Sequence, residues 1–190
     1  MNVRRRQKSA EIRRAEHAEI SDPSQVLEAA LRFLEARHRS VAEVRRRLLT
    51  RGYRADLVDG AIARLLELGM LDDEAFARAW LESRDRARPR GERALRAELA
   101  RKGISREVVD AVLDERGKTD GNGEPGEDPD AVAARKLLSR HARNLERVAD
   151  ARTRRQRAYA LLARNGFDSD TALSAISAAG IANEPGTGVP

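Results

Sequence analysis

Two arginine-rich stretches hold the side chains of this sequence that are most suited to binding chemistry. The first surrounds Pro89 and consists of Arg84, Arg86, Arg88, Arg90, Arg93 and Arg96. The second consists of Arg152, Arg154, Arg155 and Arg157. A guanidinium group presents paired N–H donors that match a phosphate or a carboxylate. We therefore predict that both clusters bind an acidic partner surface or a nucleic-acid backbone; the alternative is that they are ordinary solvated helix surface.

Catalytic motifs are incomplete in this sequence. Residues 117–119 read Gly-Lys-Thr, like the end of a phosphate-binding loop, but that motif needs a glycine five positions earlier, where Val112 stands. The histidines, which are His17, His38 and His141, lack the spacing of a metal site or a catalytic triad. We therefore predict no catalytic residues, no cofactor and no metal ion, and we expect that the protein is not an enzyme.

The composition favours a helical protein of the cytoplasm. Aromatic residues are only 3% of the 190 residues, so aliphatic side chains must build the interior, and of these Ala and Leu favour helices. The absence of cysteine excludes disulfides and thiolate metal sites. No apolar run approaches the roughly 18 residues of a membrane span, and the basic N-terminus lacks the apolar core of a secretory signal. The net charge of +6 draws the chain to nucleic acid or to acidic proteins.

Three glycines mark an internal repeat. Each follows a leucine by four residues and directly precedes a larger apolar residue; the sets are Leu48, Gly52 and Tyr53, then Leu99, Gly103 and Ile104, then Leu162, Gly166 and Phe167. This pattern predicts a helix that ends in a Schellman turn, where the glycine takes a positive φ and the two apolar side chains meet. The glycines are 51 and 63 residues apart, and the difference equals the 12 residues 117–128, which are mostly acidic or glycine.

Apolar residues at helical spacing predict helices on both sides of each glycine. These helices are expected at about 23–37, 40–52, 55–68, 72–88, 92–102, 106–116, 129–143, 152–164 and 169–179. Asp72 is the predicted N-cap of the fourth helix, and Asp73 lies in its first turn, where the helix dipole favours a negative charge. Together they give an all-α fold of three tandem three-helix repeats, which would stack into an elongated, curved modular body. The predicted divisions are a basic flexible tail (1–24), in which a frayed helix could form at 9–19, repeat 1 (25–71), repeat 2 (72–116), an acidic linker (117–128), repeat 3 (129–182) and a disordered end (183–190).

Residues between Ser40 and Leu113 match a known family in order and spacing. They are Ser40 with Glu43, 48–52, 69–73, Phe76, Trp80, Arg90 with Gly91, Glu98 with Leu99, and 102–104. This segment resembles the RecX family of recombinase regulators. The resemblance implies that the chain binds the RecA recombinase in the groove of its filament on DNA. It also implies that the chain limits filament growth, ATP hydrolysis, strand exchange and repressor cleavage, as part of DNA repair and the SOS response in a bacterial cytoplasm. It supplies no catalytic residues.

Two other functions remain open at this point. One alternative is a protein that acts chiefly by nonspecific DNA binding through its arginine clusters and N-terminal arm, and the other is a helical-repeat adaptor for a different partner. Phosphate contacts weaken steeply as the salt concentration rises, so a steep salt dependence of binding distinguishes the DNA-binding alternative from the other two functions. Binding assays with and without RecA distinguish an adaptor for another partner from a RecA regulator. In each case we expect a monomer.

Overall fold

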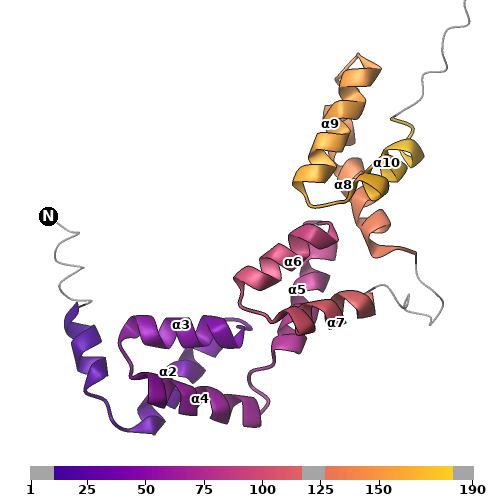
Figure 1. The fold of residues 1–190 in the computed structure, drawn as a ribbon. Helices are drawn as coiled ribbons and strands as arrows, with labels where there is room; N and C mark the ends of the chain where they lie inside the picture. The colour runs from indigo at the N-terminus through magenta and orange to yellow at the C-terminus, as the bar shows by residue number, and fades with distance from the viewer. Residues whose placement is uncertain (1–10, 117–126, 182–190) are drawn as a thin grey trace, which may run out of the picture. The chain divides into compact units, whose positions relative to one another are not determined.

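Every regular element in the described part of the chain is an α-helix, which confirms the predicted fold class (Figure 1). The structure is a computed structural model, and it describes residues 11–116 and 127–181. The labelled helices are α2 (Pro23–Leu34), α3 (Val41–Arg51), α4 (Ala55–Glu67), α5 (Asp73–Ala87), α6 (Glu92–Arg101), α7 (Arg106–Arg116), α8 (Pro129–Glu146), α9 (Ala151–Arg164) and α10 (Ser169–Ala178). Each predicted helix has its counterpart among them. The parts of the predictions that concern 1–10, 117–126 and 182–190 lie outside the described residues.

The chain forms two compact units. Unit 1 contains the described residues up to Phe76 together with Lys102–Ser105, and unit 2 contains Ala77–Arg101 and the described residues from Arg106 onward. The division therefore runs through the predicted repeat 2. The first turn of α5 and the turn between α6 and α7 belong to unit 1, and the rest of α5, α6 and α7 belongs to unit 2 with α8, α9 and α10.

The core of unit 1 is built from α2, α3 and α4. Its buried side chains are mainly aliphatic and recur at helical spacing; they are Val26, Ala29, Ala30, Val44, Leu48, Tyr53, Val58, Ala61, Ile62, Leu65 and Leu71. Both α2 and α3 pack on α4. The abundant alanines allow these helices to approach closely, so a small module excludes water with few aromatic rings.

Unit 2 has a similar aliphatic interior. The buried residues of α8 to α10 and of the turn before α10 are Ala133, Ala134, Leu137, Leu138, Leu145, Ala158, Leu162, Phe167, Ala172, Ala175 and Ile176. The buried apolar residues of α5, α6 and α7 in this unit are Ala77, Leu81, Leu95, Leu99, Val109, Val112 and Leu113. These residues recur at helical spacing, as expected for helices that bury one face.

The three repeated glycines take the predicted left-handed conformation. Their φ angles are 101° for Gly52, 81° for Gly103 and 88° for Gly166. At Gly52 and Gly166 the hydrogen bonds of a Schellman turn are present, since the amide after each glycine donates to a leucine carbonyl five residues earlier, at 3.3 Å in both turns. The leucine and the residue after the glycine are buried in all three repeats, as predicted.

Two of these glycine turns pack against the start of a helix in the preceding repeat. In unit 1, Gly103 lies so close to Ala42 that a Cβ at Gly103 would overlap the alanine side chain. In unit 2, a Cβ at Gly166 would overlap Ala94 in the same way. We call these contacts the first and the second glycine joint. Each joins the turn of one repeat to the first turn of the second helix of the repeat before it.

A hydrogen bond accompanies each glycine joint. In the first, the Ser40 hydroxyl donates to the carbonyl of Lys102, the residue before the glycine, at 2.6 Å. In the second, the Gly91 amide donates to the carbonyl of Asn165, again the residue before the glycine, at 3.0 Å. Ser40 is the N-cap of α3, and Gly91 directly precedes α6. The sequence repeat therefore has a physical basis in a joint that occurs in both units.

We predict that Gly103→Ala destabilises the fold, whereas Gly60→Ala does not. The first change forces an alanine into a left-handed conformation, at about 1–2 kcal/mol, and adds the overlap with Ala42. Gly60 lies inside α4 with open space around its Cα, so alanine there is expected to change stability by about 1 kcal/mol in the favourable direction. Chemical denaturation of both variants measures the difference. Equal free energies of unfolding of Gly103→Ala and the parent would contradict the close packing of Gly103 on Ala42.

Candidate functional site

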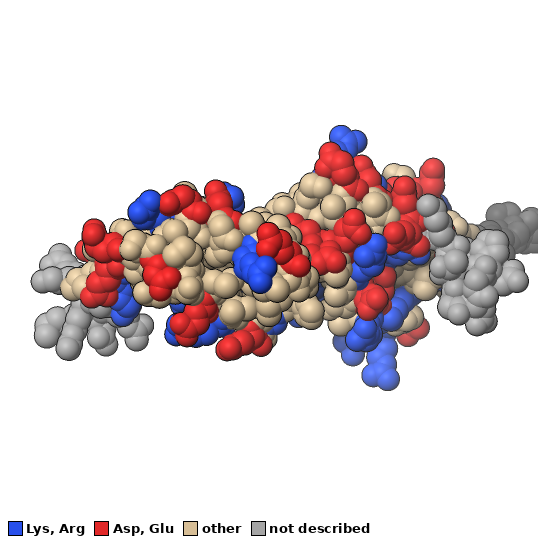
Figure 2. Space-filling view, turned by 90° about the horizontal axis from the view of Figure 1, so that it is seen from below, with Lys and Arg blue, Asp and Glu red and all other residues tan. Residues whose placement is uncertain are grey.

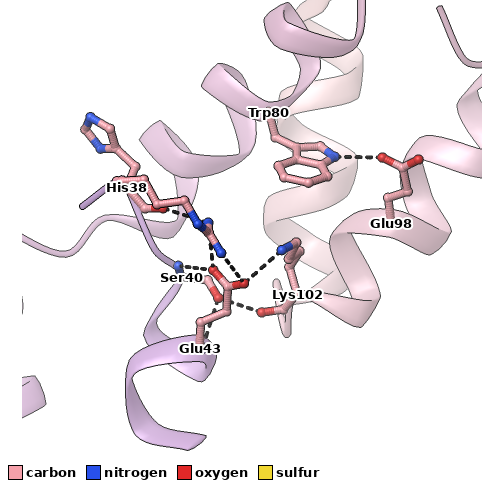
Figure 3. A network of polar contacts seen from close by, with 7 residues as sticks. His38, Ser40, Glu43, Trp80, Glu98 and Lys102 are labelled. Carbon is pink, nitrogen blue, oxygen red and sulfur yellow. Dashed lines mark hydrogen bonds and ion pairs between the residues drawn. The ribbon is translucent and has the colours of Figure 1, made fainter. Parts of the chain in front are cut away.

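The first glycine joint contains a network of polar side chains centred on Glu43 (Figure 3). Ser40 and Glu43 form a capping box at the start of α3, in which each residue's side chain accepts a bond from the other's backbone amide. The Glu43 carboxylate also accepts hydrogen bonds from Lys102 Nζ at 2.8 Å and from Arg37 at 3.1 Å. Burial alone raises the pKa of Glu43, but the bonds from Lys102 and Arg37 hold it below its usual value. Glu43 is thus a charged structural anchor rather than a group that exchanges protons near neutral pH.

An aspartate from the next repeat satisfies the first amide of α3 and of α6. The Val41 N–H donates to Asp73 Oδ1 at 2.9 Å in unit 1. The Glu92 N–H donates to Asp130 Oδ2 at 2.7 Å in unit 2. First-turn amides have no partner within their own helix, so each carboxylate replaces the water that would otherwise bind there. Sequence reasoning predicted only that Asp73 interacts favourably with the dipole of its own helix. It missed the contact with Val41, because the two residues are distant in the chain.

Glu98 of α6 contacts three side chains, two from α5 and one from the turn between α5 and α6. Trp80 Nε1 donates to Glu98 at 2.9 Å, as Figure 3 shows, and Arg84 Nε donates to the same oxygen at 2.6 Å. The Arg84 guanidinium also lies over the Trp80 ring, 4.3 Å from its centre. Arg90 Nε lies 3.7 Å from the other oxygen of Glu98. A carboxylate between two cations and an indole N–H is fully occupied within unit 2.

The first predicted arginine cluster therefore separates into two groups. Arg84, Arg90 and Arg96 are held within unit 2: Arg84 by Glu98, Arg90 by Glu98 and by the Asn165 side chain, and Arg96 by Glu92 and Asp110. Arg86, Arg88 and Arg93 are exposed. Arg86 makes only a long contact of 3.9 Å with Glu82, and Arg88 and Arg93 have no ion-pair partner among the described residues. The exposed group is available to an outside partner.

Two cations of α8 bind the carbonyls at the end of α5, beside this exposed group. Lys136 donates to the carbonyl of Asp85 at 2.6 Å, and Arg140 donates to the carbonyls of Arg86 and Ala87 at 2.9 and 2.6 Å. These carbonyls end α5, where the helix dipole favours positive charge. Pro89, which follows, is fully buried. The turn between α5 and α6 is therefore a fixed support for the exposed arginines.

A buried arginine that the sequence did not single out connects three helices of unit 2. Arg116, at the end of α7, donates to Asp85 of α5 at 2.6 Å and to Asp130 of α8 at 2.9 Å. Its side chain is only 9% exposed, so water does not replace these bonds. No local sequence pattern distinguishes Arg116 from an ordinary arginine in the last turn of a helix.

The second predicted cluster lies in the first half of α9. Arg154 is partly buried and donates to the carbonyl of Val148 at 3.2 Å. Arg152, Arg155 and Arg157 are exposed, and no carboxylate among the described residues lies within ion-pair distance of them. Elsewhere, basic and acidic side chains are interspersed, as on the face in Figure 2. This cluster is therefore a second basic surface, and its exposed arginines make no close ion pair with a described residue.

Two further searches of residues 11–116 and 127–181 bear on the kind of site present. No group of three or more histidine, aspartate and glutamate side chains is arranged to hold a metal ion. No helix in these ranges is long and apolar enough to cross a membrane. In the described residues, the fold and the arginine clusters define a modular all-helical protein with exposed basic surfaces.

Comparisons with known proteins identify the family. Residues 27–65 match the family model described as RecX, first three-helix domain, and residues 72–113 match RecX, second three-helix domain. The chain is 36% identical over 147 residues to Regulatory protein RecX of Mycobacterium sp. (strain JLS), covering 77% of each protein. It is 36% identical over 148 residues to Regulatory protein RecX of Mycobacterium tuberculosis (strain ATCC 25177 / H37Ra), covering 78% of this chain and 82% of the relative.

Solved structures agree on the fold. The crystal structure of RecX from Lactobacillus salivarius matches with a TM-score of 0.69 at 18% identity, over 82% of this chain and 95% of that chain. Taken with the sequence relatives, this places the chain in the RecX family of regulatory proteins, as its resemblance predicted. Both matched three-helix domains lie within the predicted repeats 1 and 2.

We predict that Asp73→Ala and Asp73→Asn have different effects on stability. Alanine removes the acceptor of the Val41 N–H and leaves that amide without its partner, at a cost of about 1–3 kcal/mol. Asparagine keeps an oxygen acceptor and carries no charge. Chemical denaturation at neutral pH is expected to rank asparagine well above alanine. Equal stabilities of the two variants contradict the assigned bond.

The pH dependence of stability provides a further test of Asp73. Burial raises the pKa of Asp73 above its ordinary value, and the charge of Asp72 acts in the same direction, although the bond from Val41 opposes both. The folded state then binds the proton more tightly than the unfolded state, so the contribution of Asp73 to stability falls as pH rises through the raised pKa. Relative to Asp73→Asn, the parent is expected to lose stability across this acid range. A constant difference between the two proteins refutes the assignment.

Proposed function

We propose that this chain binds filaments of the RecA recombinase on DNA and limits RecA ATPase, strand exchange and co-protease activities. The observation that carries the proposal is membership of the RecX family, with matches to both family domains and to relatives named Regulatory protein RecX. The family resemblance implies RecA as the protein partner. On this proposal the chain works by binding, as a monomer in a bacterial cytoplasm, during DNA repair and the SOS response.

The exposed arginines beside the α5–α6 turn are the first proposed contact surface. Arg86, Arg88 and Arg93 are exposed at the end of α5, in the turn after it and at the start of α6, and this region is held by buried Pro89 and by bonds from α8. A fixed support lowers the entropy lost when a side chain is ordered by its partner. Arginine pairs well with carboxylates of RecA and with phosphates of the DNA in the filament. Arg84, Arg90 and Arg96 support this surface from within and do not themselves make the contact.

The exposed arginines of α9 are the second proposed contact surface. Arg152, Arg155 and Arg157 have no carboxylate partner among the described residues, so binding an anion to them breaks no internal ion pair. This surface belongs to the C-terminal part of unit 2, outside the residues matched by the two family domains. Its contribution is therefore tested separately from that of the first surface.

The test of the function is the rate of ATP hydrolysis by RecA on single-stranded DNA, titrated with this chain. A fall in rate that saturates with added protein is expected. The same titration with RecA-independent DNA binding measured in parallel distinguishes control of RecA from simple competition for DNA. An unchanged ATPase rate at saturating concentrations of this chain rejects the proposed function.

We predict that the triple variant Arg86→Ala, Arg88→Ala, Arg93→Ala inhibits RecA ATPase at least about tenfold less potently, or about 1.4 kcal/mol. The three side chains are exposed, so circular dichroism and thermal stability are expected to match the parent. The matched control replaces three exposed arginines that already have carboxylate partners, Arg45, Arg54 and Arg64.

The control removes the same charge from surface positions and is expected to keep parental potency. A folded triple variant with unchanged potency removes the α5–α6 surface from the contact. The corresponding variant of Arg152, Arg155 and Arg157 then tests the α9 surface.

A further inference from the structure

The segment before α2 covers the glycine turn of repeat 1. Residues 11–18 are helical, in the part of the N-terminal tail where the sequence allows a frayed helix. His17 Nδ1 lies 2.7 Å from the carbonyl of Arg51, the residue before Gly52, and the bond requires the tautomer with a proton on Nδ1. The His17 ring also stacks on Tyr53, with ring centres 4.4 Å apart and planes 17° apart.

This contact reproduces the glycine joints of the later repeats. A Cβ on Gly52 would overlap the backbone and side chain of Arg14, just as Gly103 and Gly166 leave no room for a Cβ. The carbonyl before the glycine receives a donor in all three cases, here from His17. The helix at 11–18 thus takes the place that a preceding repeat would occupy, and it is held beside the end of α3.

The position of this helix creates a basic hollow. It has a volume of about 460 Å³ and is lined by Arg13, Arg14, His17, Arg47, Thr50 and Arg51. An adjoining hollow of about 560 Å³ shares His17, Arg47 and Arg51 with it, so the two form one continuous groove. We call this the N-terminal basic groove. Among the described residues, Glu28 is the one acidic side chain that lines either hollow, and it is paired with Arg32 at 3.0 Å.

The groove is lined by four arginines that have no ion-pair partner among the described residues. Among the described residues, no carboxylate lies within ion-pair distance of Arg13, Arg14, Arg47 or Arg51. By contrast, five other arginines of this unit pair with carboxylates; they are Arg32, Arg37, Arg45, Arg54 and Arg64. Four adjacent guanidinium groups repel one another, and a bound polyanion relieves that repulsion.

The donors and acceptors in the groove identify the kind of anion. The arginines offer only N–H donors, and the carbonyl of Arg51 at the end of α3 is already occupied by His17. An acidic peptide carries backbone N–H groups that need acceptors, and the groove offers few. A phosphodiester backbone carries acceptors alone. The lining therefore suits consecutive phosphates better than a peptide.

We propose that the N-terminal basic groove, between the helix at 11–18 and α3, binds the phosphate backbone of a nucleic-acid strand. The proposal does not depend on RecA, and binding is measured without it. Arg13, Arg47 and Arg51 contact phosphates, while His17 and Arg14 hold the helix in place on the Gly52 turn. Because the contacts reach only the backbone, the groove binds without sequence preference.

The test compares two triple variants of the full chain for binding to a fluorescently labelled oligothymidylate. The groove variant is Arg13→Gln, Arg47→Gln, Arg51→Gln. The control is Arg45→Gln, Arg54→Gln, Arg64→Gln, which removes the same charge from unit 1 at arginines that have carboxylate partners. All six side chains are exposed, so both proteins are expected to fold, and circular dichroism verifies this.

The groove variant is expected to bind at least about tenfold more weakly than the parent at low salt, while the control stays within about twofold. The slope of log K against log salt is expected to fall by about 2 for the groove variant, since each lost phosphate contact contributes about 0.7. Parental affinity and slope in the folded groove variant overturn the proposal. Equal losses in both variants also overturn it, because they show an effect of net charge alone.

RecA ATPase, measured with the same two variants, keeps this proposal separate from the proposed function. A groove variant that fails to bind oligothymidylate but still inhibits RecA supports an independent nucleic-acid site. Failure of the parent to inhibit RecA leaves the binding comparison, and hence the groove proposal, unaffected.

Discussion

The packing of a glycine turn on the start of a helix in the preceding repeat is the contact on which each unit depends. Because Gly103 carries no Cβ, its backbone reaches Ala42, and the carbonyl of Lys102 comes within bonding distance of the Ser40 hydroxyl. The same geometry recurs at Gly166. A positive φ and a close approach act at one residue, and neither is compatible with a larger side chain. The glycine that ends a helix is thus also the residue that attaches one repeat to the next.

The joints bury polar groups, and the chain supplies a partner for each of those described above. Amides in the first turn of a helix normally bind water, so covering them costs free energy unless an acceptor replaces the water. Asp73 and Asp130 are those acceptors. Glu43 binds the Lys102 ammonium in the first joint, and Arg116 binds the Asp130 carboxylate in unit 2. This internal use of charge also decides which arginines are left for a partner, and it links the assembly of the fold to the proposed contact surfaces.

Local patterns predicted the helices, the left-handed glycines and the buried leucines, since each rests on residues close in sequence. They did not predict which arginines point inward, because Arg90 is held by Asn165, 75 residues away. For the same reason they predicted the place of Asp73 in the first turn of α5 but not its bond to Val41. The helix at 11–18 has little apolar character of its own, and its position follows from His17 on the turn at Gly52. Contacts between charged residues that are distant in the chain produce no periodic pattern in the sequence. A charged residue that is solvated therefore cannot be told from one that is paired by its local sequence.

Amide hydrogen exchange tests the joints most directly. Val41, Glu92 and Ala151 are the first residues of α3, α6 and α9, the second helices of the three repeats. The amides of Val41 and Glu92 donate to Asp73 and Asp130, whereas the Ala151 amide has no acceptor among the described residues. After correction for intrinsic rates, the first two amides are expected to exchange far more slowly than that of Ala151. Exchange at Val41 and Glu92 as fast as at Ala151 contradicts the account.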